Sequence, residues 1–133
     1  MEHQNSDQED EEFLLEHYES ETYRGRLEKP TVSHQILNRT CGDSVTLDLL
    51  LESNRVIQAK FEAEGCVICQ AAASILCETI EGMELSELNS LDAPQMLKSM
   101  RIILSPRRMR CGLLAWETLQ QMKTKFESSV KRK

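Results

Sequence analysis

The sequence has no long hydrophobic run, few aromatic residues and no excess of positive charge. No apolar stretch approaches the roughly 20 residues that a membrane-spanning helix needs. Its 22 acidic residues outnumber its 16 basic ones, whereas domains that bind DNA or RNA usually carry a basic surface. With three Phe, two Tyr and one Trp, the core must be built mainly from aliphatic and methionine side chains. We therefore expect neither a membrane nor a nucleic acid as a partner.

The two ends of the chain differ in composition from its middle. Residues 1–12 carry six acidic residues and no lysine or arginine, which is typical of a disordered acidic tail and unlike a secretory or mitochondrial leader. We therefore expect a cytoplasmic protein. Residues 128–133 are polar and end in Lys-Arg-Lys, which predicts a basic C-terminal tail. Residues 13–127 have the length of one domain.

The order of hydrophobic patterns predicts an α+β fold. A short helix is expected at 13–20. Alternating apolar and polar residues then predict three strands, at 32–38, 45–51 and 57–63. A short turn joins the last two strands, which indicates an antiparallel hairpin with one buried face. Patterns of helical period follow, at 67–81, 84–90, 93–103 and 106–126. We predict a small three-stranded antiparallel sheet backed by helices on one face.

Three of the five cysteines stand at junctions between predicted elements. An odd number of cysteines without an apparent secretory leader argues against a disulfide scaffold. Cys41 and Asp43 lie between the first two strands, Cys66 lies before the second helix, and Cys111 lies near the start of the last helix. Three thiols and a carboxylate form a suitable tetrahedral donor set for zinc, and thiolates also hold iron–sulfur clusters. The residues alone leave open whether these thiols bind metal or fill the core.

Two further cysteines and a run of basic residues have more than one interpretation. Cys69 follows Cys66 by three residues, so it could join a metal site, form a disulfide with Cys66, or simply be a small buried residue. Cys77 lies among aliphatic residues and is expected in the core. Residues 93–116 contain basic residues and no acidic one, namely Lys98, Arg101, Arg107, Arg108 and Arg110. This reversal of charge suits either stabilisation of a thiolate or persulfide near Cys111, contact with an acidic partner, or a solvated helix face.

Three short segments resemble the cysteine boxes of the U-type iron–sulfur cluster assembly proteins, the family of the Isc and Suf U proteins and the N-terminal domain of NifU. The segments are Asn-Arg-Thr-Cys-Gly-Asp at 38–43, Phe-Glu-Ala-Glu-Gly-Cys at 61–66 and Arg-Met-Arg-Cys at 108–111, and they stand in the family's order. Ala-Ala-Ala-Ser at 71–74 resembles the small-residue helix after the second box. The resemblance spans Phe13 to Phe126.

The resemblance implies a site formed by Cys41, Asp43, Cys66 and Cys111 that holds Zn²⁺, iron or a [2Fe–2S] cluster. It also implies that Cys41 accepts persulfide sulfur from a pyridoxal-phosphate cysteine desulfurase, for delivery to a downstream iron–sulfur acceptor or Suf scaffold protein. Arg110 stands where the Isc branch has a histidine ligand, and a guanidinium offers no lone pair to a metal. Arg110 therefore favours the zinc-dependent sulfur relay of the Suf branch, although the short spacing from Cys66 to Cys111 is closer to the Isc branch.

The residues leave two alternative functions open. One is a metal-free thiol-redox protein that uses the Cys66-x-x-Cys69 pair. The other is a structural zinc domain without sulfur chemistry, in which Cys41 would resist alkylation until the metal was chelated. A metallohydrolase or a nucleotide-dependent enzyme is not indicated, because closely spaced histidines and a phosphate-binding glycine loop are missing. We expect a scaffold or sulfur carrier, at most a zinc-dependent sulfurtransferase.

Overall fold

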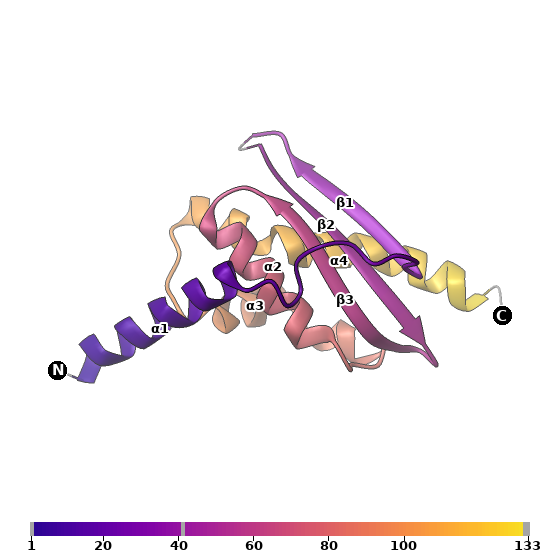
Figure 1. The fold of residues 1–133 in the computed structure, drawn as a ribbon, viewed down its shortest axis with the longest axis horizontal. Helices are drawn as coiled ribbons and strands as arrows, with labels where there is room; N and C mark the ends of the chain where they lie inside the picture. Colours follow the sequence, from indigo (N-terminus) through magenta and orange to yellow (C-terminus); the bar gives the residue numbers. More distant parts are fainter. Residues whose placement is uncertain (1, 41, 132–133) are drawn as a thin grey trace.

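The elements follow the order that the sequence predicts: a helix, three strands and then helices (Figure 1). The computed structural model describes residues 2–40 and 42–131. In chain order the elements are α1 (Glu2–Glu19), β1 (Val32–Asn38), β2 (Asp43–Glu52), β3 (Arg55–Glu64), α2 (Val67–Ile80), the 3₁₀ turn η1 (Glu87–Ser90), α3 (Ala93–Ser99) and α4 (Pro106–Lys131). The strands pair antiparallel in the order β1-β2-β3. The predicted fold class is confirmed.

Alternation along the strands turns one face of the sheet toward α2 and α4 (Figure 1). Val45, Leu47 and Leu49 on β2 are fully buried, and Leu47 pairs with the equally buried Phe61 on β3. The alanines at 71–73 of α2 are also fully buried, and such small side chains permit a close approach to neighbouring elements. The core is accordingly aliphatic with several methionines, as the scarcity of aromatic residues predicts.

Several helix boundaries differ from the sequence predictions. The first helix begins at Glu2 rather than at residue 13, so residues 2–12, expected to be a disordered acidic tail, are helical. Glutamate has a good helix propensity, and acidic residues near a helix N-terminus interact favourably with its dipole.

Three boundaries later in the chain also differ. The helix expected at 93–103 ends at Ser99, because Arg101 has a positive φ of 66° that a helix does not accommodate. The segment predicted at 84–90 forms only the short turn η1, while α4 continues to Lys131, into the segment expected to be a basic tail. Within the described residues, no helix combines the length and apolar character that crossing a membrane requires.

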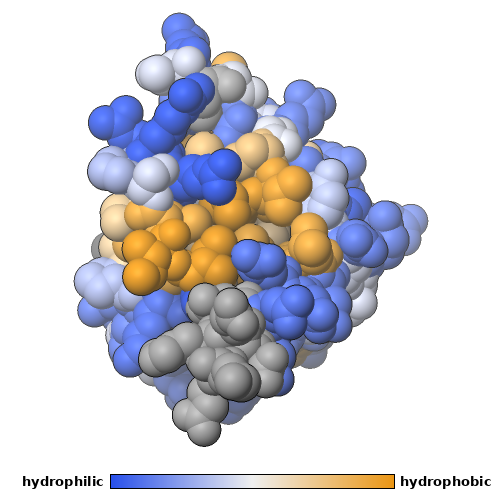
Figure 2. Space-filling view, turned by 90° about the vertical axis from the view of Figure 1, so that its left-hand side faces the viewer, coloured by the Kyte–Doolittle hydropathy of each residue, from blue (hydrophilic) through white to orange (hydrophobic). Residues whose placement is uncertain are grey.

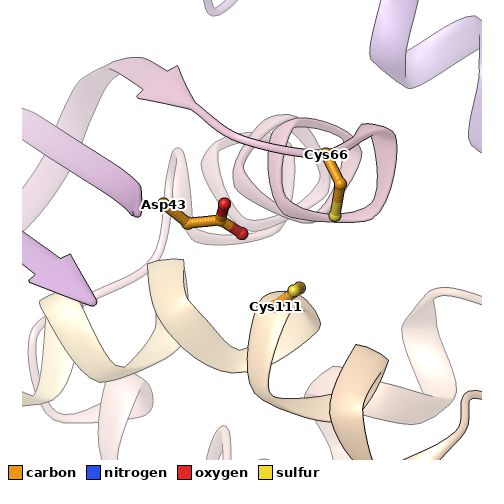
Figure 3. Close-up of side chains that lie close together, drawn as sticks. All are labelled: Asp43, Cys66 and Cys111. Carbon is orange, nitrogen blue, oxygen red and sulfur yellow. The ribbon is translucent and has the colours of Figure 1, made fainter. Parts of the chain in front are cut away.

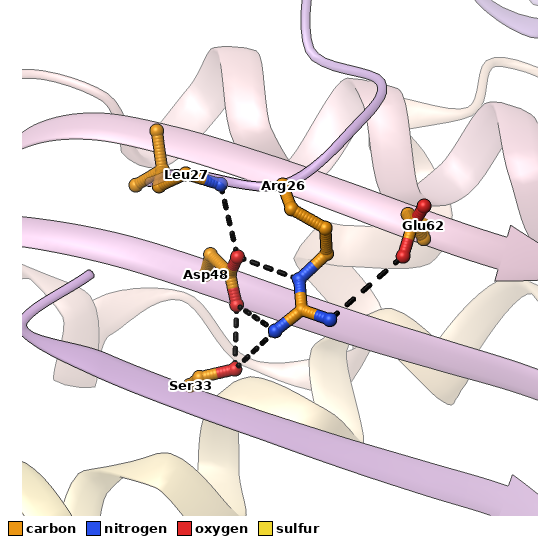
Figure 4. Close-up of polar contacts among 5 residues, drawn as sticks. All are labelled: Arg26, Leu27, Ser33, Asp48 and Glu62. Atoms are coloured by element: carbon orange, nitrogen blue, oxygen red, sulfur yellow. Dashed lines mark hydrogen bonds and ion pairs between the residues drawn. The ribbon is translucent and has the colours of Figure 1, made fainter. Parts of the chain in front are cut away.

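The face of the sheet away from the helices is crossed by the segment between α1 and β1 (Figure 1). Within it, Arg26 donates from Nε to Asp48 Oδ2 at 2.7 Å and from Nη2 to Oδ1 at 3.2 Å (Figure 4). The Leu27 N–H and the Ser33 hydroxyl also donate to the Asp48 carboxylate. Asp48 is consequently only 1% exposed. The sequence suggests that this face is open to solvent, and that expectation is wrong at Asp48 because the crossing segment covers it.

The contacts of Asp48 make the stability of the fold depend on pH. Burial by itself would raise the pKa of Asp48, but the hydrogen bonds from Arg26, Ser33 and the Leu27 backbone outweigh it and lower the pKa below its ordinary value. A carboxyl group with a lower pKa in the folded state stabilises the fold above its unfolded pKa of about 3.9. That stabilisation is lost as the pH falls through the folded pKa.

Replacing Arg26 with methionine should destabilise the fold by about 1–2 kcal/mol at neutral pH, because a buried carboxylate loses two of its donors. The expected loss of stability is smaller than for a fully buried ion pair, because the Arg26 side chain is half-exposed. Urea unfolding measures the effect, which should shrink as the pH falls through the lowered pKa of Asp48 and its carboxyl group becomes protonated.

The matched control is Arg55→Met. Arg55 pairs with Glu84 at 3.0 Å between two exposed side chains, so its loss should cost about 1 kcal/mol or less. An Arg26 variant that is no less stable than the Arg55 variant would contradict the role assigned to Arg26.

Candidate metal site

Three elements meet beyond one end of the sheet and bring Asp43, Cys66 and Cys111 together (Figure 3). Asp43 is the first residue of β2, Cys66 is the N-cap of α2, and Cys111 lies in the second turn of α4. One oxygen and two sulfur atoms from these side chains lie within 4.8 Å of one another. The fold thus brings together three of the four ligands predicted from the sequence. The fourth, Cys41, lies outside the described residues.

The start of α2 leaves the Cys66 sulfur available to the site. The backbone of Cys66 is extended, with φ −71° and ψ 170°, and its carbonyl accepts the Gln70 N–H at 3.2 Å. Its side chain makes no capping hydrogen bond, although the N-cap position commonly does so. The exposed thiol instead points toward the Cys111 side chain (Figure 3).

Gly65 provides the room for the carboxyl group of Asp43. A Cβ added at Gly65 would stand 2.6 to 2.9 Å from the three carboxyl atoms of Asp43, which is closer than such atoms approach. Asp43 is 6% exposed, and its Oδ2 has no hydrogen-bond partner among the described residues. A buried carboxylate oxygen without a donor is costly, so this oxygen is suited to a cation.

The thiol of Cys111 has a raised pKa. Burial, together with the neighbouring Asp43 carboxyl group and Cys66 sulfur, raises its pKa to about 12. The arginines at 107, 108 and 110 are exposed and are not among the groups that raise this pKa. A metal that binds here must displace the thiol proton.

The other candidate residues lie outside this group. Cys69 is fully buried in α2 and is not one of the three residues that converge. Cys77 is in the core as predicted, and burial raises the pKa of its thiol. Arg110 is exposed next to Cys111 in the chain.

Sequence reasoning missed the residues that surround Cys66. Gln70 donates from Nε2 to the Gly65 carbonyl at 3.0 Å, and Arg24 donates from Nη1 to Gln70 Oε1 at 2.8 Å. The available signal was a polar side chain at position 70 in a run of apolar residues from 67 to 73. Arg24 has no comparable signal, because its partner lies 46 positions away in the chain.

An apolar patch covers the side of the molecule where α1, the start of α2 and the loop before α4 lie (Figure 2). Exposed hydrophobic residues near the start of α2 and in the first turn of α4 include Val67, which follows Cys66, and Met109, which stands two residues before Cys111. Ile103, in the loop before α4, is completely exposed. Exposed apolar patches of this kind commonly mark contact surfaces.

Comparison with known proteins identifies relatives over most of the chain. Residues 9–133 match the model of the NifU-like N terminal domain. The iron–sulfur cluster assembly scaffold protein IscU of Thermotoga maritima is 37% identical in an alignment 126 positions long, and the match covers 83% of this chain and 89% of that protein. The zinc-dependent sulfurtransferase SufU of Bacillus subtilis is 27% identical in an alignment 133 positions long, and the match covers 87% of this chain and 90% of that protein.

A solved structure supports the same relationship. It is the crystal structure of a proposed iron–sulfur cluster assembly scaffold protein for the SUF system from Fervidobacterium islandicum. It superposes with a TM-score of 0.70 at 26% sequence identity. The match covers 82% of this chain and 92% of the other.

Replacing Gly65 with alanine should destabilise the fold by about 2–4 kcal/mol, because it combines a strained positive φ with a clash against Asp43. In an Asp43→Ala background the clash is removed, so the same substitution should cost roughly half as much. Denaturant unfolding of the four proteins of this cycle measures the difference. Gly82→Ala is the matched control, since Gly82 also has a positive φ but no atom within 4 Å of an added Cβ. Equal costs in both backgrounds would rule out the contact between Gly65 and Asp43.

Proposed function

This chain belongs to the NifU-like N-terminal domain family of iron–sulfur cluster assembly proteins, and on that premise we propose that it accepts sulfane sulfur at a zinc or iron site. The proposed ligands are Cys41, Asp43, Cys66 and Cys111. The observation that carries the proposal is the buried Asp43 oxygen, which has no donor among the described residues and lies beside two thiols.

The donor set fits a tetrahedral thiolate-rich metal site. Zinc prefers sulfur, nitrogen and carboxylate ligands, and a tetrahedral site with Zn–S bonds of about 2.3 Å separates its ligand atoms by roughly 3.7 Å. The described ligand atoms already lie within 4.8 Å of one another. Cys41 stands two residues before Asp43, across Gly42, whose φ of 78° permits a tight turn. When bound, the metal supplies the positive charge that keeps the thiols deprotonated.

Sulfur acceptance is proposed as a thiol–persulfide exchange at Cys41. The Cys41 thiolate attacks the outer sulfur of a persulfide on a cysteine of the donor protein. A sulfur–sulfur bond forms on Cys41 while the bond on the donor breaks, and the donor cysteine leaves as a thiolate, so no oxidant is consumed. The proposed donor is a pyridoxal-phosphate cysteine desulfurase, and the recipient is a downstream iron–sulfur or Suf scaffold protein. Arg110, which cannot ligate a metal, favours relay over the assembly of a [2Fe–2S] cluster.

The proposed contact surface for the donor is the apolar patch and its basic surroundings. The exposed side chains of Lys98, Arg101, Arg107, Arg108 and Arg110 lie on α3, the loop before α4 and the start of α4. In a chain of net charge −6, this local positive charge suits a partner surface that is apolar at its centre and acidic around it. Such a contact would bring the donor persulfide to the end of the sheet where the ligands meet.

Protein purified without oxygen should contain about one zinc or iron ion per chain. The variants Asp43→Ala, Cys66→Ser and Cys111→Ser should each lose most of it, because each removes a ligand atom. Cys77→Ala is the control, since it removes a buried thiol outside the group and should retain the metal. Elemental analysis and a determination of acid-labile sulfide measure the outcome: zinc without sulfide supports the relay, and iron with sulfide supports the scaffold.

A folded protein with neither metal nor sulfide, or one whose metal content is unaffected by the three ligand variants, would contradict the proposed site. A Cys66–Cys69 disulfide with a defined reduction potential in that protein would establish the thiol-redox alternative instead.

The variant Cys41→Ser should remain folded but lose sulfur acceptance, because a hydroxyl cannot carry the transferred sulfur. Incubation with a cysteine desulfurase and cysteine, followed by alkylation and mass spectrometry, detects the persulfide and its position. Thermal unfolding checks the fold, and Cys77→Ala again serves as the control. Full persulfide loading of the Cys41→Ser variant rules out Cys41 as the acceptor.

A further inference from the structure

We propose that Arg24 and Gln70 are positioning residues that hold Cys66 in place for metal binding. Their contacts, which we call the Arg24–Gln70 network, connect the core of the sheet to the peptide group that precedes Cys66. This proposal deepens the proposed function and rests on the metal site described there.

Gln70 binds both residues that precede α2. Its backbone N–H donates to the Cys66 carbonyl at 3.2 Å, and its side-chain Nε2 donates to the Gly65 carbonyl at 3.0 Å. The usual ways of fixing a helix start are missing here, since the Cys66 side chain makes no capping hydrogen bond and the first turn of α2 has no acidic residue. Gln70 therefore fixes the start of α2 from within the helix, and the Cys66 sulfur remains available to a metal.

Arg24 fixes the orientation of the Gln70 amide. Its Nη1 donates to Gln70 Oε1 at 2.8 Å. A guanidinium only donates and a carbonyl only accepts, so one orientation of the amide satisfies both neighbours, with Oε1 toward Arg24 and Nε2 toward Gly65. Arg24 is itself held in place, because its Nη2 donates to the Tyr18 carbonyl at 2.6 Å and its guanidinium carbon lies 5.1 Å from the centre of the Phe61 ring.

The Arg24–Gln70 network begins in the hydrophobic core, at Phe61. Phe61 is fully buried in β3, and its backbone binds the segment that carries Arg24. The Phe61 N–H donates to the Tyr23 carbonyl at 2.8 Å, and the Gly25 N–H donates to the Phe61 carbonyl at 2.7 Å. Both peptide groups that flank Arg24 are therefore anchored to the sheet, and its side chain is directed from there to α2.

The Arg24–Gln70 network affects two of the proposed ligands, Cys66 and Asp43, because Gly65 lies next to both. Gly65 precedes Cys66 in the chain, and its missing Cβ leaves the space that the Asp43 carboxyl group occupies. A shift of the Gly65 peptide would move the Cys66 sulfur and also change the space that the Asp43 carboxyl group occupies. In metal sites generally, removing a residue that orients a ligand lowers metal affinity by about 10–100-fold.

The test uses Gln70→Met, which keeps the length of the side chain and removes its polar atoms. Zinc affinity, measured by competition with a chromogenic chelator, should fall about 10–100-fold. The thiolate-to-metal and d–d bands of the Co²⁺-loaded protein, which report ligand geometry, should shift. In the metal-free protein, amide hydrogen exchange in the segment 65–70 should become faster. Arg24→Met should act in the same way, and the double variant should bind zinc no more weakly than Gln70→Met alone.

Arg26→Met is the matched control, because Arg26 lies two residues from Arg24 but binds Asp48 rather than Gln70. It should lower stability and leave zinc affinity and the cobalt spectrum unchanged. The proposed role of the Arg24–Gln70 network is overturned if the Arg24 and Gln70 variants lower only stability, or if their effects on zinc affinity are additive. If the parent protein binds neither zinc nor iron, the proposed function fails, and unchanged exchange at 65–70 in the metal-free variants would then separately overturn the Arg24–Gln70 network.

Discussion

The register of the β2–β3 hairpin is the constraint on which the site depends. Ser44 pairs with Glu64, so Asp43 and Gly65 come to lie beside each other where the two strands end. Side chains alternate along a strand, and Asp43 therefore shares the helix-facing side of β2 with the buried Val45 and Leu47. A slip of one residue would turn Asp43 to the opposite face. The same burial of apolar side chains that holds the sheet against α2 and α4 thus also directs a carboxyl group toward the thiols on those helices.

The two buried aspartates of β2 differ in the hydrogen-bond donors that surround them. Asp48 receives hydrogen bonds from two side chains and a backbone N–H, which lower its pKa despite burial. Asp43 is almost equally buried, yet its Oδ2 has no donor among the described residues. Because an unpaired buried oxygen is destabilising, Asp43 lowers the stability of the fold where Asp48 raises it, and the chemistry of this end of the sheet is set by that difference.

The sequence predicted most of the fold because its periodicities are strong and local. It identified the three strands and the convergence of Asp43, Cys66 and Cys111, the latter through segments that resemble a known family. It did not predict the helix at residues 2–12, since composition alone does not separate a soluble helix from a disordered tail. It also missed the Arg24–Gln70 contact and the covering of Asp48 by Arg26, because both depend on how an irregular segment crosses the sheet. An irregular segment has no hydrophobic periodicity from which its path could be predicted.

The acidic and basic groups around the site differ in their burial and in what they contact. The carboxyl group of Asp43 lies inside, beside thiols, and together with burial and the Cys66 sulfur it raises the pKa of Cys111 to about 12. The arginines at the start of α4 are exposed and are not among the groups that shift this pKa. Their charge faces solvent, where it can act on another surface, whereas the Asp43 carboxyl group is buried and acts on the neighbouring thiols. The acidic and basic groups at this end of the sheet therefore act at different depths, the carboxyl group within the fold and the arginines on its surface.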